Sequence, residues 1–199
     1  MTIGRDGRRD SAIERLVSED ITIAAYDPGW PRAFEDEKAF LLASLPPDLM
    51  RRIEHFGSTA VPGLAAKPII DMLVEVIDLE ATKTRIVPIL EERGYEYLWR
   101  PTDGDDGPPF YAWFIKRAAV THVRTHHIHM VEASFLDHWR RLVFRDFLIA
   151  HPDVARDYEM LKRRLAADHR NDRVAYTRGK TMFIEAVMAR ATQEQRAGV

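Results

Sequence analysis

A glycine-serine pair followed by an aspartate is the clearest candidate for chemistry in the sequence. Gly57-Ser58 precedes Asp71 by twelve intervening residues, and Asp71 lies inside the apolar run PIIDMLV. Glycine lets the backbone approach a ligand closely, and the hydroxyl and N–H groups of Ser58 and Thr59 could hold phosphate oxygens. A lone carboxylate is costly to bury, so we expect Asp71 at an exposed strand end or beside a cation. The alternatives are an ordinary turn and an aspartate that only accepts backbone hydrogen bonds.

A second candidate is the histidine-rich segment THHIHMVE, residues 125–132, which we expect to form a strand. Side chains alternate between the two faces of a strand, so His127 and His129 share one face. If this strand neighbours that of Asp71, the three side chains could act as catalytic groups and ligate a divalent ion, Mg, Mn or Zn. Imidazole prefers zinc and other transition metals to magnesium. The alternative is that both histidines are hydrogen-bonded within the sheet.

Several cations could bind an anionic substrate. Lys67 lies in the loop before Asp71, Arg124 leads into the histidine segment, and Arg145 and Lys180 lie in predicted helices. Arginine offers a planar fork that suits phosphate, whereas lysine is a point charge. We take Lys67, Arg124 and Lys180, with the glycine-serine turn, as candidates for binding a nucleotide or another phosphate-bearing small molecule. The alternative for each cation is a solvated surface or an internal ion pair.

Composition excludes several classes of function. The 29 basic and 31 acidic side chains nearly cancel, which makes nucleic acid an unlikely partner for the whole molecule. There are no cysteines, which excludes disulfides, thiolate catalysis and cysteine-ligated zinc and is typical of a reducing compartment. No apolar run approaches the roughly 20 residues that span a bilayer. We therefore expect a cytoplasmic protein that makes no membrane contact.

The elements that position these residues can be predicted from periodicity and from turn residues. At 199 residues with 46% hydrophobic side chains, the chain can form one compact domain. We expect a peripheral arm over 1–20 and a single domain over 21–199. The pattern predicts an α/β (α+β) fold with a small mixed sheet flanked by helices and with a C-terminal helical half. Strands are expected at 21–26, 52–56, 67–76, 95–99, 110–117 and 125–132. Helices are expected at 31–45 and 79–93, from 135 to the turn at Pro152, from Pro152 onward, and at 179–191.

The central segment IEHFGSTAVPGLAAKPIIDMLVEV resembles the signature of the GrpB family (UPF0157-like), a branch of the nucleotidyltransferase superfamily. The resemblance covers residues 22–190. Its other parts are YDPGWPRAFEDEKAFL, HHIHMVE, WRRLVFRDFLIAHPDVARDYEMLKRRLA and YTRGKTMFIEAV. The resemblance implies a nucleotidyltransferase-like sheet with the glycine-serine turn at its site.

The sequence departs from the superfamily pattern at one position. The resemblance implies a second acid two residues after the first, so that both carboxylates hold magnesium against a nucleotide. Leu73 occupies that position in this chain. Glu75 shares the face of Asp71, but four residues of strand separate the two by roughly 13 Å, which is too far for one magnesium ion.

Three functions remain open from the sequence. The first is metal-dependent nucleotide binding or nucleotidyl transfer, with His127 or His129 replacing the missing acid. The second is a non-catalytic module that binds a nucleotide or a partner protein; GrpB-like domains also occur fused to dephospho-coenzyme-A kinase, which implies a link to coenzyme A metabolism by association. The third is a metal-dependent hydrolase or phosphotransferase that uses the His-x-His strand.

Overall fold

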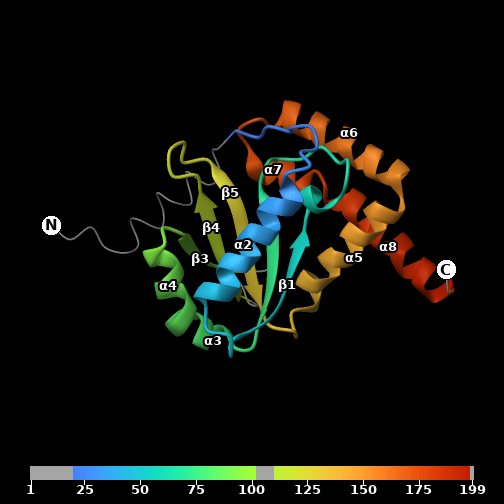
Figure 1. The fold of residues 1–199 in the computed structure, drawn as a ribbon. Coiled ribbons are helices and arrows are strands. Elements are labelled where there is room, and N and C mark those ends of the chain that lie inside the picture. Colours follow the sequence, from blue (N-terminus) through green and yellow to red (C-terminus); the bar gives the residue numbers. More distant parts are fainter. Residues whose placement is uncertain (1–19, 102–109, 198–199) are drawn as a thin grey trace.

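Five strands form one mixed sheet at the centre of the fold (Figure 1). The structure is a computed structural model that describes residues 20–101 and 110–197. The order of strands in the sheet is β1-β2-β5-β4-β3, and only the β2–β5 pair is parallel. The strands are β1 (Met50–Phe56), β2 (Ile70–Val76), β3 (Glu96–Pro101), β4 (Phe110–Arg117) and β5 (Arg124–Val131). This mixed sheet, flanked by helices, confirms the α+β fold predicted from the sequence.

Each face of the sheet is covered by a different group of helices. The first face carries the side chains of Met72 and Ile128 and packs against α2 (Trp30–Ser44) and α4 (Val87–Glu92). The opposite face carries Leu73 and Trp113 and packs against α5 (Leu136–Ala150). Helix α5 then joins α6 and α8 in a second apolar cluster at one side of the sheet (Figure 1). The bounds of the remaining helices are α6 (Pro152–Asp168), α7 (Arg173–Arg178) and α8 (Thr181–Ala197).

The segment expected as one helix over 79–93 consists of three consecutive helical pieces. These are α3 (Leu79–Ala81), the π-helical η2 (Thr82–Ile86) and α4. Pro88 has no N–H and its ring would clash with the carbonyl four residues earlier, so the turn before it widens. The helix ends before Gly94, which has a φ of 84°, as expected for a glycine just after a helix.

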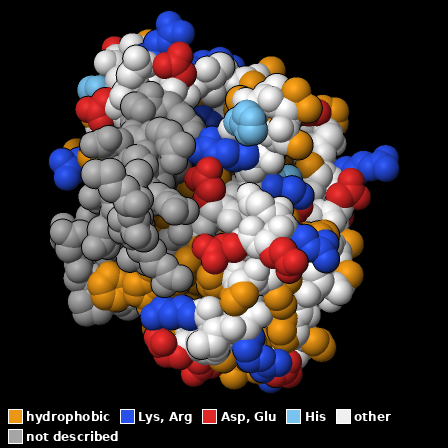
Figure 2. Space-filling model, turned by 90° about the vertical axis from the view of Figure 1, so that its left-hand side faces the viewer, with side chains coloured by type: hydrophobic (Ala, Val, Ile, Leu, Met, Phe, Trp, Pro, Cys, Tyr) orange, Lys and Arg blue, Asp and Glu red, His pale blue; other side chains and the backbone are white. Residues whose placement is uncertain are grey.

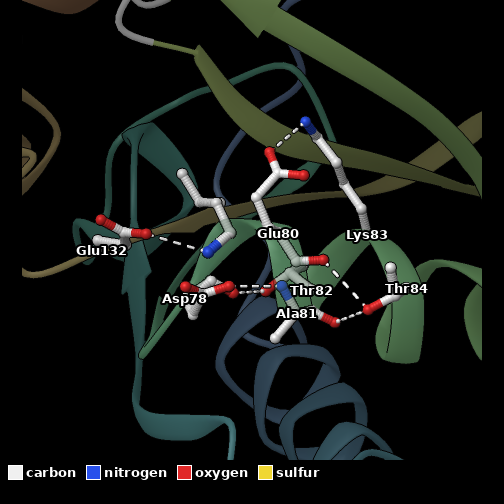
Figure 3. A network of polar contacts seen from close by, with 8 residues as sticks. Asp78, Glu80, Ala81, Thr82, Lys83, Thr84 and Glu132 are labelled. Atoms are coloured by element: carbon white, nitrogen blue, oxygen red, sulfur yellow. Dashed lines mark hydrogen bonds and ion pairs between the residues drawn. The ribbon is translucent and has the colours of Figure 1, made fainter.

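Side-chain contacts fix the start of this helical segment against the sheet (Figure 3). The Asp78 carboxylate accepts a hydrogen bond from the N–H of Ala81 and so caps the first turn. The Glu132 carboxylate, just after β5, accepts one from the N–H of Leu79 at 3.0 Å. Both N–H groups would otherwise lack a partner at the helix start.

Two predictions about the fold need correction and one lies outside the structure. The strand expected at 21–26 is extended chain with a single bridge, between Ala24 and Ala66. The last helix begins at Thr181 rather than at 179 and runs to Ala197, and a short helix, α7, precedes it. The predicted arm over 1–20 lies outside the described residues except for Asp20.

The surface is mixed in charge. On the face shown in Figure 2, the side chains of Lys and Arg lie among those of Asp and Glu, in keeping with the small net charge of -2. None of the helices within residues 20–101 and 110–197 is long and apolar enough to cross a membrane.

Candidate functional site

Asp71 and His127 form a pair across two parallel strands. Asp71 is the second residue of β2 and lies directly opposite His127 of β5. The Nδ1–H of His127 donates to Oδ1 of Asp71 over 3.1 Å, and the two side chains are 11% and 28% exposed, respectively. Burial lowers the pKa of His127, so the imidazole is neutral near pH 7. Burial raises the pKa of Asp71, but the hydrogen bond from His127 and the charges of Lys67 and Arg141 outweigh it and leave the pKa below its ordinary value.

The turn after β1 brings the backbone against this carboxylate. Gly57 has a φ of 73° and a ψ of -173°, a conformation that is essentially restricted to glycine. A Cβ atom at this position would lie 2.5 Å from Oδ2 of Asp71. Glycine is therefore required both by the backbone conformation and by the close approach of Asp71, as expected if the turn and the aspartate belong to one site.

The two hydroxyl groups after Gly57 have different surroundings. Thr59 is 1% exposed, and its hydroxyl donates to the carbonyl of Ile69. The same oxygen lies 3.0 Å from Nε2 of His55, so it accepts the Nε2–H. Thr59, predicted as a substrate-binding residue, instead ties the turn to the sheet. Ser58 forms a side-chain hydrogen bond with Tyr158 of α6, which links the turn to the helical half.

Three lysines converge on two buried tyrosines beside this turn, and we name Lys67, Lys162 and Lys180 the lysine cluster. The ammonium groups of Lys67 and Lys180 lie 5.2 and 4.6 Å from the ring centroid of Tyr176. That of Lys162 lies 5.0 Å from the ring of Tyr158 and also donates to the carbonyl of Ala65. Tyr176 and Tyr158 are 1% and 5% exposed. Lys67 and Lys180 are far apart in sequence and were predicted separately as anion ligands, yet their ammonium groups lie over the same ring.

Burial and neighbouring positive charges disfavour the charged form of the three lysines and lower their pKa values. Burial, together with the charges of Lys180 and Arg173, lowers the pKa of Lys67 to about 7. Burial lowers the pKa of Lys180 to about 8, while the carboxylate of Asp71 opposes the shift. Lys162 is also lowered by burial, to about 7. The negative charges that act on the cluster are those of Asp71, at Lys67 and Lys180, and of Glu159, at Lys162.

Two arginines of this neighbourhood have no motif to mark them in the sequence. Arg141 of α5 acts electrostatically on Asp71 and on Lys180. Arg173, the first residue of α7, acts on Lys67 and Lys180. Both lie on helices, where a cation is ordinarily solvated surface. The packing of α5 against the sheet and of α7 against α6 brings them to the site. Arg124, which was predicted, starts β5 and is 6% exposed.

His129 does not join the Asp71–His127 pair. It lies opposite Leu73, stacks on Tyr111 with ring centroids 5.3 Å apart, and meets Phe56 edge-on. His138 of α5 contacts the same tyrosine, with centroids 4.4 Å apart. We name His127, His129 and His138 the histidine row. Burial lowers the pKa of all three, that of His138 to about 3.

Several ring nitrogens of the histidine row are enclosed by protein. Nε2 of His127, Nδ1 of His129 and both ring nitrogens of His138 are buried, with no hydrogen-bond partner among the described residues. Within residues 20–101 and 110–197, no three His, Cys, Asp or Glu side chains are grouped so that they could hold a metal ion. The predicted metal site of Asp71, His127 and His129 is therefore not assembled. His129 lies two residues farther along β5 than His127, where it packs between the rings of Phe56 and Tyr111.

The second carboxylate of the superfamily pattern is also missing from the structure. Leu73 is fully buried and packs with Phe56 and Trp113. Glu75 is bound to Arg52, with Nε and Oε2 2.8 Å apart. The residues present do not fit a magnesium ion held by two carboxylates.

Other residues considered from the sequence have structural roles. Arg145 donates to the carbonyl of His55 at 2.7 Å and pairs with Glu54 and Asp146. Tyr111 and Trp113 of β4 are 3% and 5% exposed and pack in the core.

Both the sequence and the structure of this chain are similar to those of known proteins. The GrpB family, described as GrpB protein, matches residues 20–190. The chain is 39% identical to UPF0157 protein PA4798 of Pseudomonas aeruginosa, over 94% of this chain and 72% of that protein. It is 37% identical to UPF0157 protein YqkA of Bacillus subtilis over 83% of its own length, but spans only 45% of YqkA. The crystal structure of the conserved protein GrpB from Enterococcus faecalis superposes with a TM-score of 0.74 at 33% identity, covering 87% of this chain and 99% of that one.

Proposed function

We propose that this chain, which belongs to the GrpB family, binds a phosphate-bearing small molecule, a nucleotide in the first instance, between the lysine cluster and the Gly57-Ser58 turn. One observation carries the proposal: the ammonium groups of Lys67 and Lys180 lie over the same buried ring, that of Tyr176. Cations that are brought together in this way repel each other, and a bound anion removes the repulsion.

The electrostatics favour an anion with more than one negative charge. The positive charges near the turn come from Lys67, Lys180, Arg141 and Arg173, whereas Asp71 supplies one negative charge that also serves His127. A phosphate group carries up to two charges and accepts several hydrogen bonds, and charge-assisted bonds to it are roughly twice as strong as neutral ones. Binding would raise the pKa of both lysines, and the site would take up protons as it binds.

The geometry supports binding more directly than it supports nucleotidyl transfer. Transfer of the usual kind needs two carboxylates to hold magnesium, and Leu73 and the Arg52–Glu75 pair leave Asp71 as the one carboxylate at the turn. The N–H groups of Ala60 and Val61 are already donated to the carbonyls of Gly57 and Ser58. At the turn itself, the Ser58 hydroxyl would have to exchange its hydrogen bond with Tyr158 for one to a phosphate oxygen.

Isothermal titration of the purified chain with ATP, with and without magnesium, tests the proposal. We expect saturable binding of ATP. In Lys180→Gln the Kd should increase about tenfold or more, because a charge-assisted hydrogen bond contributes about 1.5–3 kcal/mol. Lys38→Gln is the matched control, since Lys38 lies on α2 and pairs with Glu35. Binding that is unchanged in Lys180→Gln, or absent from the native chain, would overturn the proposal. Incorporation of labelled nucleotide would establish transfer in addition.

A further inference from the structure

The six lysines of the chain differ in what holds their ammonium groups. Three of them form ion pairs with carboxylates of the described chain: Lys38, Lys83 and Lys116. Lys162 donates to a backbone carbonyl and is 2% exposed. The ammonium groups of Lys67 and Lys180 form no ion pair and no hydrogen bond with residues 20–101 or 110–197, and each lies beside the ring of Tyr176 instead.

Of these two lysines, Lys67 lines a pocket. The pocket has a volume of about 370 Å³ and is formed where β4 ends and where β2 and β5 begin. The side chain of Lys67 is partly exposed, and the wall beside it is apolar at Pro68, Ile69 and Val123. This size is within the range of small-molecule sites, which usually combine an apolar wall with a few polar groups. A small molecule in this pocket can therefore meet the amine of Lys67.

An amine in these surroundings gives up its proton easily. Burial, together with the charge of Lys180, lowers the pKa of Lys67 to about 7, so a large share of the molecules carry a neutral amine near pH 7. A lysine that is desolvated, or that lies next to another cation, is of the kind that attacks carbonyl groups. The pKa of Lys162 is also lowered to about 7 by burial, but its nitrogen is bonded to the carbonyl of Ala65 and is enclosed.

We propose that Lys67 forms an imine with the carbonyl group of a small phosphate-bearing aldehyde or ketone in this pocket, and that the phosphate of this molecule lies beside Lys180. The inference rests on the proposed function, which has a phosphate bound at the lysine cluster. In the reaction, the amine nitrogen of Lys67 attacks the carbonyl carbon, and the carbonyl oxygen takes up a proton from that nitrogen. Loss of one water molecule from this adduct leaves the carbon–nitrogen double bond, so neither an oxidant nor a reductant is needed.

Lys67 and Lys180 are suited to different parts of such a molecule. The pKa of Lys180, about 8, leaves most of its side chains charged at pH 7, as a phosphate ligand requires. The nitrogens of Lys67 and Lys180 lie 5.2 and 4.6 Å from the ring centroid of Tyr176, so one small molecule can contact both.

Reductive labelling of the native chain tests this inference, with pyridoxal 5′-phosphate and pyridoxal as probes. These two aldehydes differ only in the phosphate, and cyanoborohydride converts an imine into a stable amine whose position peptide mass spectrometry identifies. At pH 7 we expect Lys67 to be labelled about tenfold or more faster than Lys38, because an ordinary lysine, with a pKa of about 10.4, is almost fully protonated there. With pyridoxal, the labelling rate of Lys67 should level off above about pH 8, whereas that of an ordinary lysine increases to about pH 10.

The phosphate is tested by comparing the two probes. We expect pyridoxal 5′-phosphate to label Lys67 about tenfold faster than pyridoxal at low probe concentration, because a charge-assisted hydrogen bond to the phosphate favours its binding. In Lys180→Gln this ratio should fall towards one. Lys67→Arg keeps the positive charge and should remove the labelled peptide, whereas Lys38→Arg is the matched control and should leave the labelling of Lys67 unchanged.

The outcomes separate this inference from the proposed function. The rates of Lys67 and Lys38 are compared within one native chain, so the comparison does not depend on whether a variant folds. If Lys67 is labelled no faster than Lys38, the inference is overturned, even where ATP binds and the proposed function holds. If Lys67 is labelled preferentially but the phosphate gives no advantage, a phosphate-bearing substrate is overturned. The proposed function fails as well only if ATP does not bind.

Discussion

The lysine cluster and the histidine row both hold basic side chains at lowered pKa values, yet their surroundings differ. Lys67 borders an open pocket, and its charge can be balanced by an anion from solution. His129 and His138 are enclosed by Tyr111 and neighbouring rings, and burial simply keeps them neutral. A lowered pKa therefore marks a candidate binding site only where the group can also meet a ligand.

The largest expected effect on stability comes from placing a carboxylate at position 73, beside the histidine row. Leu73→Asp would restore the second acid of the superfamily pattern, but position 73 is fully buried beside His129 and Phe56. We expect a loss of about 4 kcal/mol or more in the free energy of unfolding, from the lost packing and the buried charge. Urea denaturation measures this loss, with Leu73→Met as the control of similar volume, which should cost less than about 1.5 kcal/mol. A stable Leu73→Asp variant that gains magnesium-dependent nucleotide binding would show that this region is not sealed.

The next largest effect is expected at Gly57, whose turn lies against Asp71 between the lysine cluster and the histidine row. Gly57→Ala forces a non-glycine residue into a conformation restricted to glycine and places Cβ 2.5 Å from Oδ2 of Asp71. We expect a loss of about 3 kcal/mol in the free energy of unfolding, measured by urea denaturation. Gly63→Ala is the matched control, because Gly63 also has a positive φ, 79°, but no atom lies within 4 Å of the added Cβ; its cost should be about 1 kcal/mol. Equal losses in the two variants would mean that Asp71 does not constrain the turn.

A smaller effect appears when the histidine row is titrated. The pKa of His138 is lowered to about 3 by burial, so below its ordinary pKa of about 6.5 the unfolded chain binds a proton that the folded chain does not. The free energy of unfolding should therefore fall as pH decreases from about 6.5 towards 3. In His138→Leu this acid slope should decrease by up to about 1.4 kcal/mol per pH unit, without loss of stability at pH 7. An unchanged slope in His138→Leu would contradict the prediction.

The sequence predicted most elements but not how the helices meet the sheet. The apolar run before and after Asp71 and the alternation around His127 were sufficient to predict β2 and β5, and their pairing agrees with a shared site. The strand expected at 21–26 was wrong because the segment is extended but joins no sheet: Ala24 forms an isolated bridge with Ala66, and the N–H of Ile21 donates to the carbonyl of Arg170. That His129 is sealed depends on Tyr111 and on α5, which lie far away in sequence and whose packing no local pattern encodes. The same packing brings Arg141 to the site.

The smallest effect tests the open region at alkaline pH. The folded-state pKa of Lys180, about 8, lies below the ordinary value of 10.5, so between these values the unfolded chain binds a proton that the folded chain has lost. The free energy of unfolding should rise with pH over this interval, and in Lys180→Met the rise should be smaller by about 1 kcal/mol per pH unit, with Lys38→Met as the control. Anion binding should have the opposite dependence and weaken from pH 7 to 9, because binding needs the charged ammonium. Proton uptake during phosphate titration in buffers of different ionisation enthalpy measures this coupling directly. If stability and affinity changed with pH in the same direction, the ammonium groups of the lysine cluster would not be the anion ligands.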